Sequence, residues 1–123
     1  MEYISTASAP LAIGPYSQAI VCGNTLYASG QIPINPETGA IEAKDIAGQT
    51  EQACKNVGEV LKAAGIGFEN VVKTTCFLSD IGNFAAFNEV YAKYFVSKPA
   101  RSCVAVKDIP KGALCEIEIT TVR

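Results

Sequence analysis

The apolar residues of this chain follow two periods, which alternate along its length. Residues 16–32, YSQAIVCGNTLYASGQI, form two apolar stretches around a Gly-Asn pair, a pattern typical of a β-hairpin. Residues 113–122, ALCEIEITTV, alternate apolar and polar side chains and predict a half-buried strand. The β-branched segments 70–78 and 100–106 predict two more strands. A further short strand can be placed near the N-terminus.

Two other segments have apolar residues at helical spacing. The first helix follows the Pro/Asn/Gly loop 33–41, with Asp45 as its N-cap and Gly65 as its C-terminal glycine. The second follows SDIGN at 79–83, and its apolar stripe consists of Phe84, Phe87, Tyr91 and Phe95. The order β-β-α-β-α-β-β predicts one domain, residues 1–123, of the α+β class, with two helices packed on one face of one sheet.

Strand alternation also assigns side chains to faces of the sheet. We expect the helices to cover the more apolar face. The opposite, uncovered face is then expected to carry Ser29, Arg101, Cys103 and Glu116 together. In the second helix, Asn88 falls within the apolar stripe, so its amide requires a specific partner.

Composition narrows the classes of function. The chain has 123 residues, 49% of them hydrophobic, and a net charge of -2, which is typical of a globular domain. It has no Lys/Arg run, which argues against a nucleic-acid partner. No signal peptide or membrane-spanning run is visible, and five scattered cysteines predict free thiols in a reducing, cytoplasmic compartment. The spacing offers no zinc ligand pair, so no metal is predicted.

The absence of histidine leaves few groups for catalysis. Arg101, in PARSCVAV (99–106), is either an arginine paired with a carboxylate or a bidentate clamp for a substrate carboxylate. Glu116 is either a solvated strand carboxylate or the group that handles a proton or orients water. Cys103 fits the role of a small packed residue better than that of a nucleophile, although the neighbouring Arg101 cation could lower the pKa of its thiol. Tyr16, Ser29 and Asn88 are weaker candidates.

Five segments together resemble the Rid family. They are IGPYSQA (13–19), LYASGQIPINPETG (26–39), VVKTTCFLSDIGNFAAFNEVYAKYF (71–95), PARSCVAV (99–106) and CEIEITTV (115–122). The chain is most similar to the RidA branch, the reactive-intermediate deaminases formerly called YjgF proteins. The similarity covers essentially the whole chain.

This resemblance implies a chorismate-mutase-like fold with one mixed sheet, a homotrimer, and active sites in clefts between subunits. It also implies hydrolysis of 2-imino acids, and of the enamines that tautomerise to them, to 2-keto acids and ammonia. That reaction limits metabolite damage and uses no cofactor. By resemblance, Arg101 holds the substrate carboxylate and Glu116 orients or activates water. Cys103 contributes backbone contacts, and Tyr16, Ser29 and Asn88 line the pocket.

Two other functions remain open at this point. One is an endoribonuclease or translation inhibitor, a description long attached to some Rid proteins. The other is a regulatory module that binds an imino or keto acid in the same cleft without converting it. Release of ammonia distinguishes the imine deaminase from both.

Overall fold

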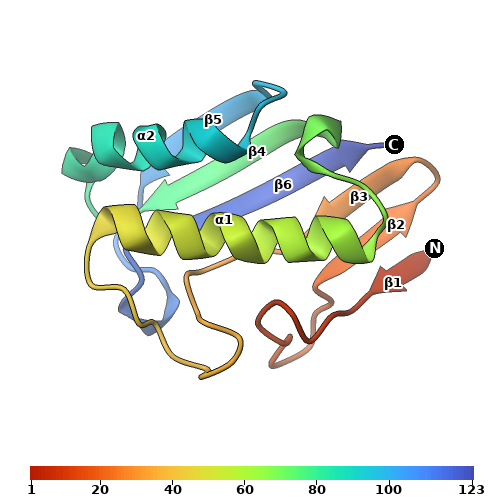
Figure 1. Ribbon diagram of the computed structural model, residues 1–123, viewed down its shortest axis with the longest axis horizontal. Coiled ribbons are helices and arrows are strands. Elements are labelled where there is room, and N and C mark those ends of the chain that lie inside the picture. Colours follow the sequence, from red (N-terminus) through yellow and green to blue (C-terminus); the bar gives the residue numbers. More distant parts are fainter.

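One six-stranded sheet with two helices on one face makes up the computed structural model, which describes residues 1–123 (Figure 1). The strands are β1 (Glu2–Ile4), β2 (Ala19–Cys22), β3 (Thr25–Ala28), β4 (Val71–Leu78), β5 (Ala100–Ala105) and β6 (Cys115–Val122). The helices are α1 (Ile46–Ala63) and α2 (Phe84–Tyr94), with short 3-10 turns at Phe68–Asn70, Ile81–Asn83 and Pro110–Gly112. The predicted α+β fold, including the short N-terminal strand, is confirmed.

The strands lie in the order β1-β2-β3-β6-β4-β5. All neighbouring pairs are antiparallel except β4 and β5, which run parallel, so the sheet is mixed. A parallel pair needs a crossover connection, and α2 supplies it. β5 therefore forms one edge of the sheet, next to α2, and β1 forms the other.

The ends of α1 follow the capping signals of the sequence. The Asp45 side chain accepts a hydrogen bond from the backbone N–H of Gly48 at 3.0 Å. At the other end, Gly65 has a φ of +75°, the left-handed conformation that glycine adopts without strain. Both predicted ends of the first helix are confirmed.

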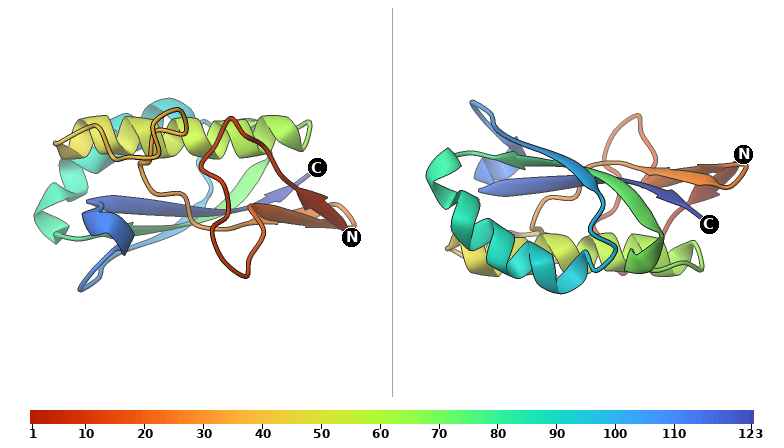
Figure 2. Two further views of the ribbon diagram at one scale, coloured as in Figure 1. Left: turned by 90° about the horizontal axis from the view of Figure 1, so that it is seen from below. Right: turned by 90° about the horizontal axis from the view of Figure 1, so that it is seen from above.

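The core lies between the helices and one face of the sheet, as the two side views show (Figure 2). Val57 and Leu61 of α1, Phe87 of α2, and Ile117 of β6 are each exposed by 1% or less. In α2, the predicted apolar stripe is buried except at Phe84, which keeps 38% of its surface exposed.

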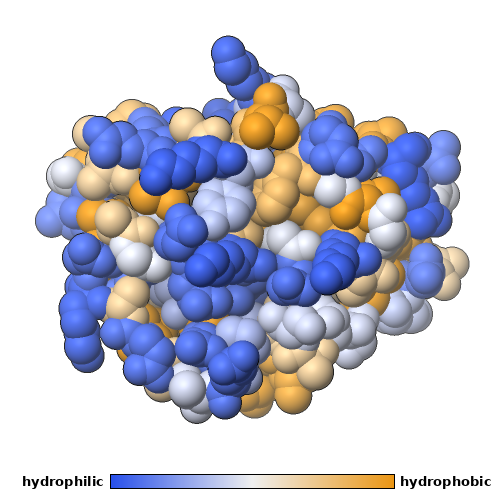
Figure 3. Space-filling model, viewed as in Figure 1, coloured by the Kyte–Doolittle hydropathy of each residue, from blue (hydrophilic) through white to orange (hydrophobic).

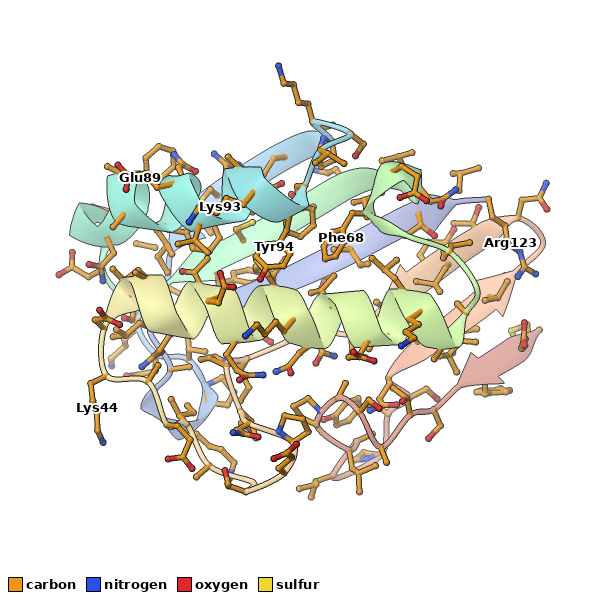
Figure 4. The ribbon with its side chains drawn as sticks, viewed as in Figure 1. Lys44, Phe68, Glu89, Lys93, Tyr94 and Arg123 are labelled. Carbon is orange, nitrogen blue, oxygen red and sulfur yellow. The ribbon has the colours of Figure 1, made fainter.

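The outer surface of the helices is hydrophilic, and blue side chains predominate over α1 (Figure 3). On α2, Glu89 and Lys93 lie on the outward side (Figure 4). Phe68 and Tyr94 point toward one another between the two helices, with ring centroids 5.6 Å apart. Neither helix is long and apolar enough to span a lipid bilayer.

The opposite face of the sheet is free of helices (Figure 2). Large apolar side chains are exposed on this face: Tyr27 is 57% exposed and Val104 is 44% exposed. Glu116 and Glu118 of β6 lie on this face, since they alternate with the buried residues of that strand. We call it the open face.

The expected arrangement of four polar residues on the open face is wrong for two of them. In the parallel pairing of β4 and β5, Arg101 lies beside Thr74 and Cys103 beside Cys76. Thr74 and Cys76 are buried under the helices, so Arg101 and Cys103 lie on the helix-covered face. Alternation within β5 does not reveal which neighbour it pairs with, and that register decides the face.

A β-bulge changes the face assignment after β3. Tyr27 pairs with Thr120, whereas Gln31 bridges Ile117, so one extra residue is inserted in this segment. As a result Gln31 is buried with the core at 6% exposure, although strict alternation along the strand would put it on the same face as Tyr27. The bulge leaves Gly30 facing the side chain of Glu116.

Buried amide side chains fix the loops at the lower edge of Figure 1. Gln18 donates to the carbonyls of Thr6 and Pro10 at 3.0 and 2.7 Å. Asn56 donates to the carbonyls of Ile32 and Ile34 at 3.0 and 2.9 Å. Because each amide is at least 97% buried, these hydrogen bonds hold the two loops firmly.

The hydroxyl of Thr121 is buried without a hydrogen-bond partner. Replacing Thr121 by valine removes that polar atom and keeps the side-chain shape, so we expect the free energy of unfolding to rise by about 1 kcal/mol. Denaturant unfolding measures the change. The matched control is Thr74→Val, because the Thr74 hydroxyl bonds the Tyr91 hydroxyl at 2.8 Å and its loss is expected to destabilise the fold. Equal effects of the two substitutions would contradict this interpretation.

Candidate functional site

The guanidinium of Arg101 is held by side chains of α2. Its Nη1 donates a hydrogen bond of 2.7 Å to Oδ1 of Asn88. The guanidinium carbon lies 4.8 Å from the centroid of the Tyr91 ring and 5.5 Å from that of Phe84. Both distances are typical of cation–π contacts, which favour a positive charge over an aromatic ring.

The cavity beside Arg101 has room for an anion. It has a volume of about 550 Å³ and lies between the C-terminal half of α2 and the start of β5. Its lining includes no carboxylate but contains two cations, Arg101 and Lys98. Since Arg101 bonds an amide and not a carboxylate within the chain, its remaining N–H groups can bind an external acid.

The other residues predicted near Arg101 have structural explanations. Asn88, which required a partner, finds it in the guanidinium and fixes its orientation. Cys103 is partly buried against the core, and burial raises the pKa of its thiol despite the opposing effect of Arg101. A raised pKa disfavours the thiolate, so Cys103 is not prepared as a nucleophile.

Glu116 belongs to a second group, on the open face of the sheet. It is half-buried and pairs with Phe77 of β4. Its carboxylate lies against Gly30, where a Cβ atom would come within contact distance of Oε2. A Cβ atom at this position would displace the Glu116 side chain, so the bulge and Gly30 together allow the carboxylate to lie where it does.

The environment of Glu116 disfavours its charged form. Burial raises the pKa of its carboxyl group, and the nearby Glu118 raises it further. A carboxyl group whose charged form is disfavoured holds a proton more readily, so it can donate one as well as accept one. This is the expected property of a group that exchanges protons with a substrate or with water.

Tyr16 and Ser29 lie on the same side as Glu116. Tyr16 is 52% exposed and lines the same cavity as Gly30. The Ser29 hydroxyl donates to the carbonyl of Ser17 at 2.6 Å, which links the loop before β2 to the bulge after β3. Tyr16, Ser29 and Glu118 also line a shallower cavity on the open face.

The predicted site residues thus form two groups on opposite faces of the sheet. The first group is Arg101, Asn88 and Cys103 on the helix-covered face, and the second is Glu116, Ser29 and Tyr16 around the open face. We call them the arginine half-site and the carboxylate half-site. The sequence analysis missed Gly30 and the aromatic contacts of Arg101, because both depend on register and packing.

The two half-sites offer complementary chemistry. The arginine half-site can bind a small carboxylate, and the carboxylate half-site can position water and move a proton. No group of three or more His, Cys, Asp or Glu residues that could hold a metal ion occurs in the chain.

Comparisons with known proteins identify close relatives. The family model described as endoribonuclease L-PSP matches residues 6–123. The human protein named 2-iminobutanoate/2-iminopropanoate deaminase is 50% identical over 98% of this chain and 88% of its own length. Two solved structures are similar over nearly the whole of both chains. A Rid family protein of Yersinia pestis is 51% identical with a TM-score of 0.96, over 99% of this chain and 98% of its own. TdcF of E. coli, solved with bound serine, is 41% identical with a TM-score of 0.95, over 100% and 99%.

Proposed function

We propose that this chain, which belongs to the endoribonuclease L-PSP family, is a 2-iminobutanoate/2-iminopropanoate deaminase. Its predicted resemblance to Rid proteins is confirmed. It hydrolyses reactive 2-imino acids to 2-keto acids and ammonia. The observation that carries this conclusion is the near-complete match to the human deaminase, at 50% identity over 98% of the chain. Four further mammalian proteins with the same name match at 47–49% identity.

The geometry of the arginine half-site supports binding of the substrate carboxylate. The guanidinium is oriented by Asn88 and by the ring of Tyr91, so little conformational freedom is lost when it binds. The structure of TdcF with bound serine provides a second argument, since serine also carries a carboxylate. We assign Arg101 as the residue that binds the carboxylate of the substrate.

The carboxylate half-site supports the chemical step. In the proposed reaction, the Glu116 carboxylate accepts a proton from water while the water oxygen attacks the C=N carbon. The imine nitrogen reacts in its protonated form, so a neutral carbinolamine results; Glu116 then returns the proton to this nitrogen, and ammonia leaves as the hydroxyl proton passes back to the Glu116 carboxylate. Atoms balance as one imine and one water giving one ketone and one ammonia. Positioning and proton transfer account for the catalysis, with Tyr16 and Ser29 lining the cleft.

The placement of the half-sites on opposite faces supports an assembly of several copies. Arg101 and Glu116 of one chain are separated by the sheet, so one substrate requires Arg101 of one copy and Glu116 of another. Tyr27 and Val104 are exposed apolar residues of the open face, so burying this face between subunits is energetically favourable. We propose the homotrimer that the resemblance implies, with its active sites between subunits.

The raised pKa of Glu116 leads to a prediction for the pH dependence. Glu118 is a like charge that raises the pKa of Glu116, so Glu118→Gln is expected to lower it. The ionised base is then present at lower pH, and the acidic limb of kcat/KM against pH shifts downward. A pH series on the parent and the variant measures the shift. Glu89→Gln, on the outward side of α2, is the control and is expected to leave the limb in place.

A coupled assay tests the proposed function. A serine/threonine dehydratase generates the imine, and semicarbazide traps whatever remains, so a deaminase reduces the semicarbazone signal and releases ammonia faster. Binding of the keto acid without this acceleration would indicate a regulatory module. Cleavage of RNA that persists through nuclease removal and disappears with Arg101→Ala would support the endoribonuclease alternative.

A further inference from the structure

A cavity of about 430 Å³ lies among the loops next to the carboxylate half-site. Its apolar walls come from the segment before β2, with Leu11 and Ile13, and from the segment after β3, with Ile32 and Ile34. Leu11 and Ile13 are 62% and 82% exposed, so two large apolar side chains lie at its mouth in contact with water. Such exposed apolar side chains around a concavity are typical of a binding site.

The walls of this cavity are fixed by buried hydrogen bonds. Gln18 holds the carbonyl of Pro10 at 2.7 Å, directly before Leu11. Asn56 holds the carbonyls of Ile32 and Ile34 from the opposite side. The two walls are therefore preformed, and an apolar group can enter without ordering either loop.

The cavity is continuous with the carboxylate half-site. Gly30 and Tyr16 line it, and Gly30 is the residue against which the Glu116 carboxylate lies. In the proposed reaction, the C=N carbon carries three groups: the carboxylate, the nitrogen and the side chain. The carboxylate extends toward Arg101 of another copy, so the side chain must extend elsewhere from a carbon held beside Glu116.

We propose that this cavity receives the side chain of the imino acid, and that Leu11, Ile13 and Ile34 determine which side chains the enzyme accepts. This inference rests on the proposed function. The names of the relatives specify 2-iminopropanoate and 2-iminobutanoate, whose side chains are only methyl and ethyl. A volume of about 430 Å³ holds on the order of a dozen water molecules, so it also accommodates longer, branched apolar side chains.

Two other cavities are less suited to this role. The cavity beside Arg101 contains the cations Lys98 and Arg101 and suits the carboxylate end of the substrate. The shallow cavity on the open face contains the carboxylate of Glu118, which would repel an anionic substrate. The cavity between Ile13 and Ile34 contains no acidic residue, and Lys111 is its one charged residue.

The test compares two imines on the assembled protein. An L-amino-acid oxidase generates them from leucine and from alanine, and semicarbazone trapping gives kcat/KM for each. Ile34→Phe fills the cavity and is expected to lower the ratio of leucine-derived to alanine-derived kcat/KM by about tenfold or more. Ile13→Ala, at a solvent-exposed position where folding is not at risk, removes a wall and is expected to raise KM for the leucine-derived imine several-fold more than for the alanine-derived one.

Val96→Ala, in the cavity beside Arg101, is the matched control and is expected to leave the ratio at the parent value. A ratio that changes with Val96 and not with Ile34 or Ile13 would place the side chain on the arginine side and overturn the inference. Hydrolysis of both imines with an unchanged ratio in all variants would also overturn it while leaving the proposed function intact. Failure of the parent protein to accelerate either hydrolysis would reject both.

Discussion

Arg101→Ala is expected to lower kcat/KM for imine hydrolysis by about thirtyfold or more, because removing one partner of a desolvated charge pair costs roughly 2–5 kcal/mol. The substrate carboxylate loses its bidentate partner, and no other group in the arginine half-site can replace the planar guanidinium. Semicarbazone trapping provides the rate, and size-exclusion chromatography with light scattering reports whether the assembly is intact. We expect it to be intact, because Arg101 bonds within its own chain and lies away from the open face.

The control for this prediction is Arg123→Ala, which removes the other arginine of the chain from the C-terminal end of β6 (Figure 4). It changes the net charge by the same amount and is expected to alter the rate less than about twofold, since isolated surface charges contribute little. Arg101→Lys distinguishes charge from geometry: it keeps the cation and loses the planar fork. Turnover by Arg101→Ala at the parental rate would disprove the clamp.

Mixing two inactive variants is expected to restore activity. In the proposed homotrimer, Arg101→Ala removes the proposed clamp and Glu116→Gln removes the proposed proton acceptor, so each variant alone is expected to be inactive. If every site takes Arg101 from one copy and Glu116 from the next, each mixed trimer contains one intact site. Co-expression at equal levels should then regain about a quarter of the parental activity, as random assembly of a cyclic trimer requires.

Two controls make this experiment decisive. The purified variants, combined without subunit exchange, should stay inactive. Parent chains co-expressed at equal levels with the double variant Arg101→Ala/Glu116→Gln should keep about a quarter of full activity, whereas half is expected if both residues act from one chain. Absence of any regain in verified mixed trimers would mean that Arg101 and Glu116 act from the same chain, in conflict with their positions on opposite faces of the sheet.

Features encoded by adjacent residues could be predicted from the sequence. The N-cap of Asp45, the glycine at 65 and the apolar stripe of α2 each depend on residues within one or two turns, and the structure confirms them. The strand segments were also recognised, because alternation and β-branched residues are local signals.

Features that depend on pairing between distant segments could not be predicted. The face of Arg101 follows from the pairing of β5 with β4, which no pattern within β5 specifies. The position of Gly30 follows from one extra residue opposite β6, and a bulge of this kind leaves no signal in an alternating segment. Since both errors concern register, the candidate residues were identified from sequence while their arrangement required the three-dimensional structure.

The parallel pairing of β4 and β5 has a consequence for how the protein folds. The arginine half-site comes from one strand–helix–strand unit within residues 71–105, so its contacts join residues close in sequence. The carboxylate half-site combines the N-terminal loop, the bulge after β3 and the last strand, which are separated by most of the chain. Since nearby contacts close with less loss of chain entropy, we expect the arginine half-site, which binds the anion, to become native early, and the carboxylate half-site only after both termini have joined the sheet.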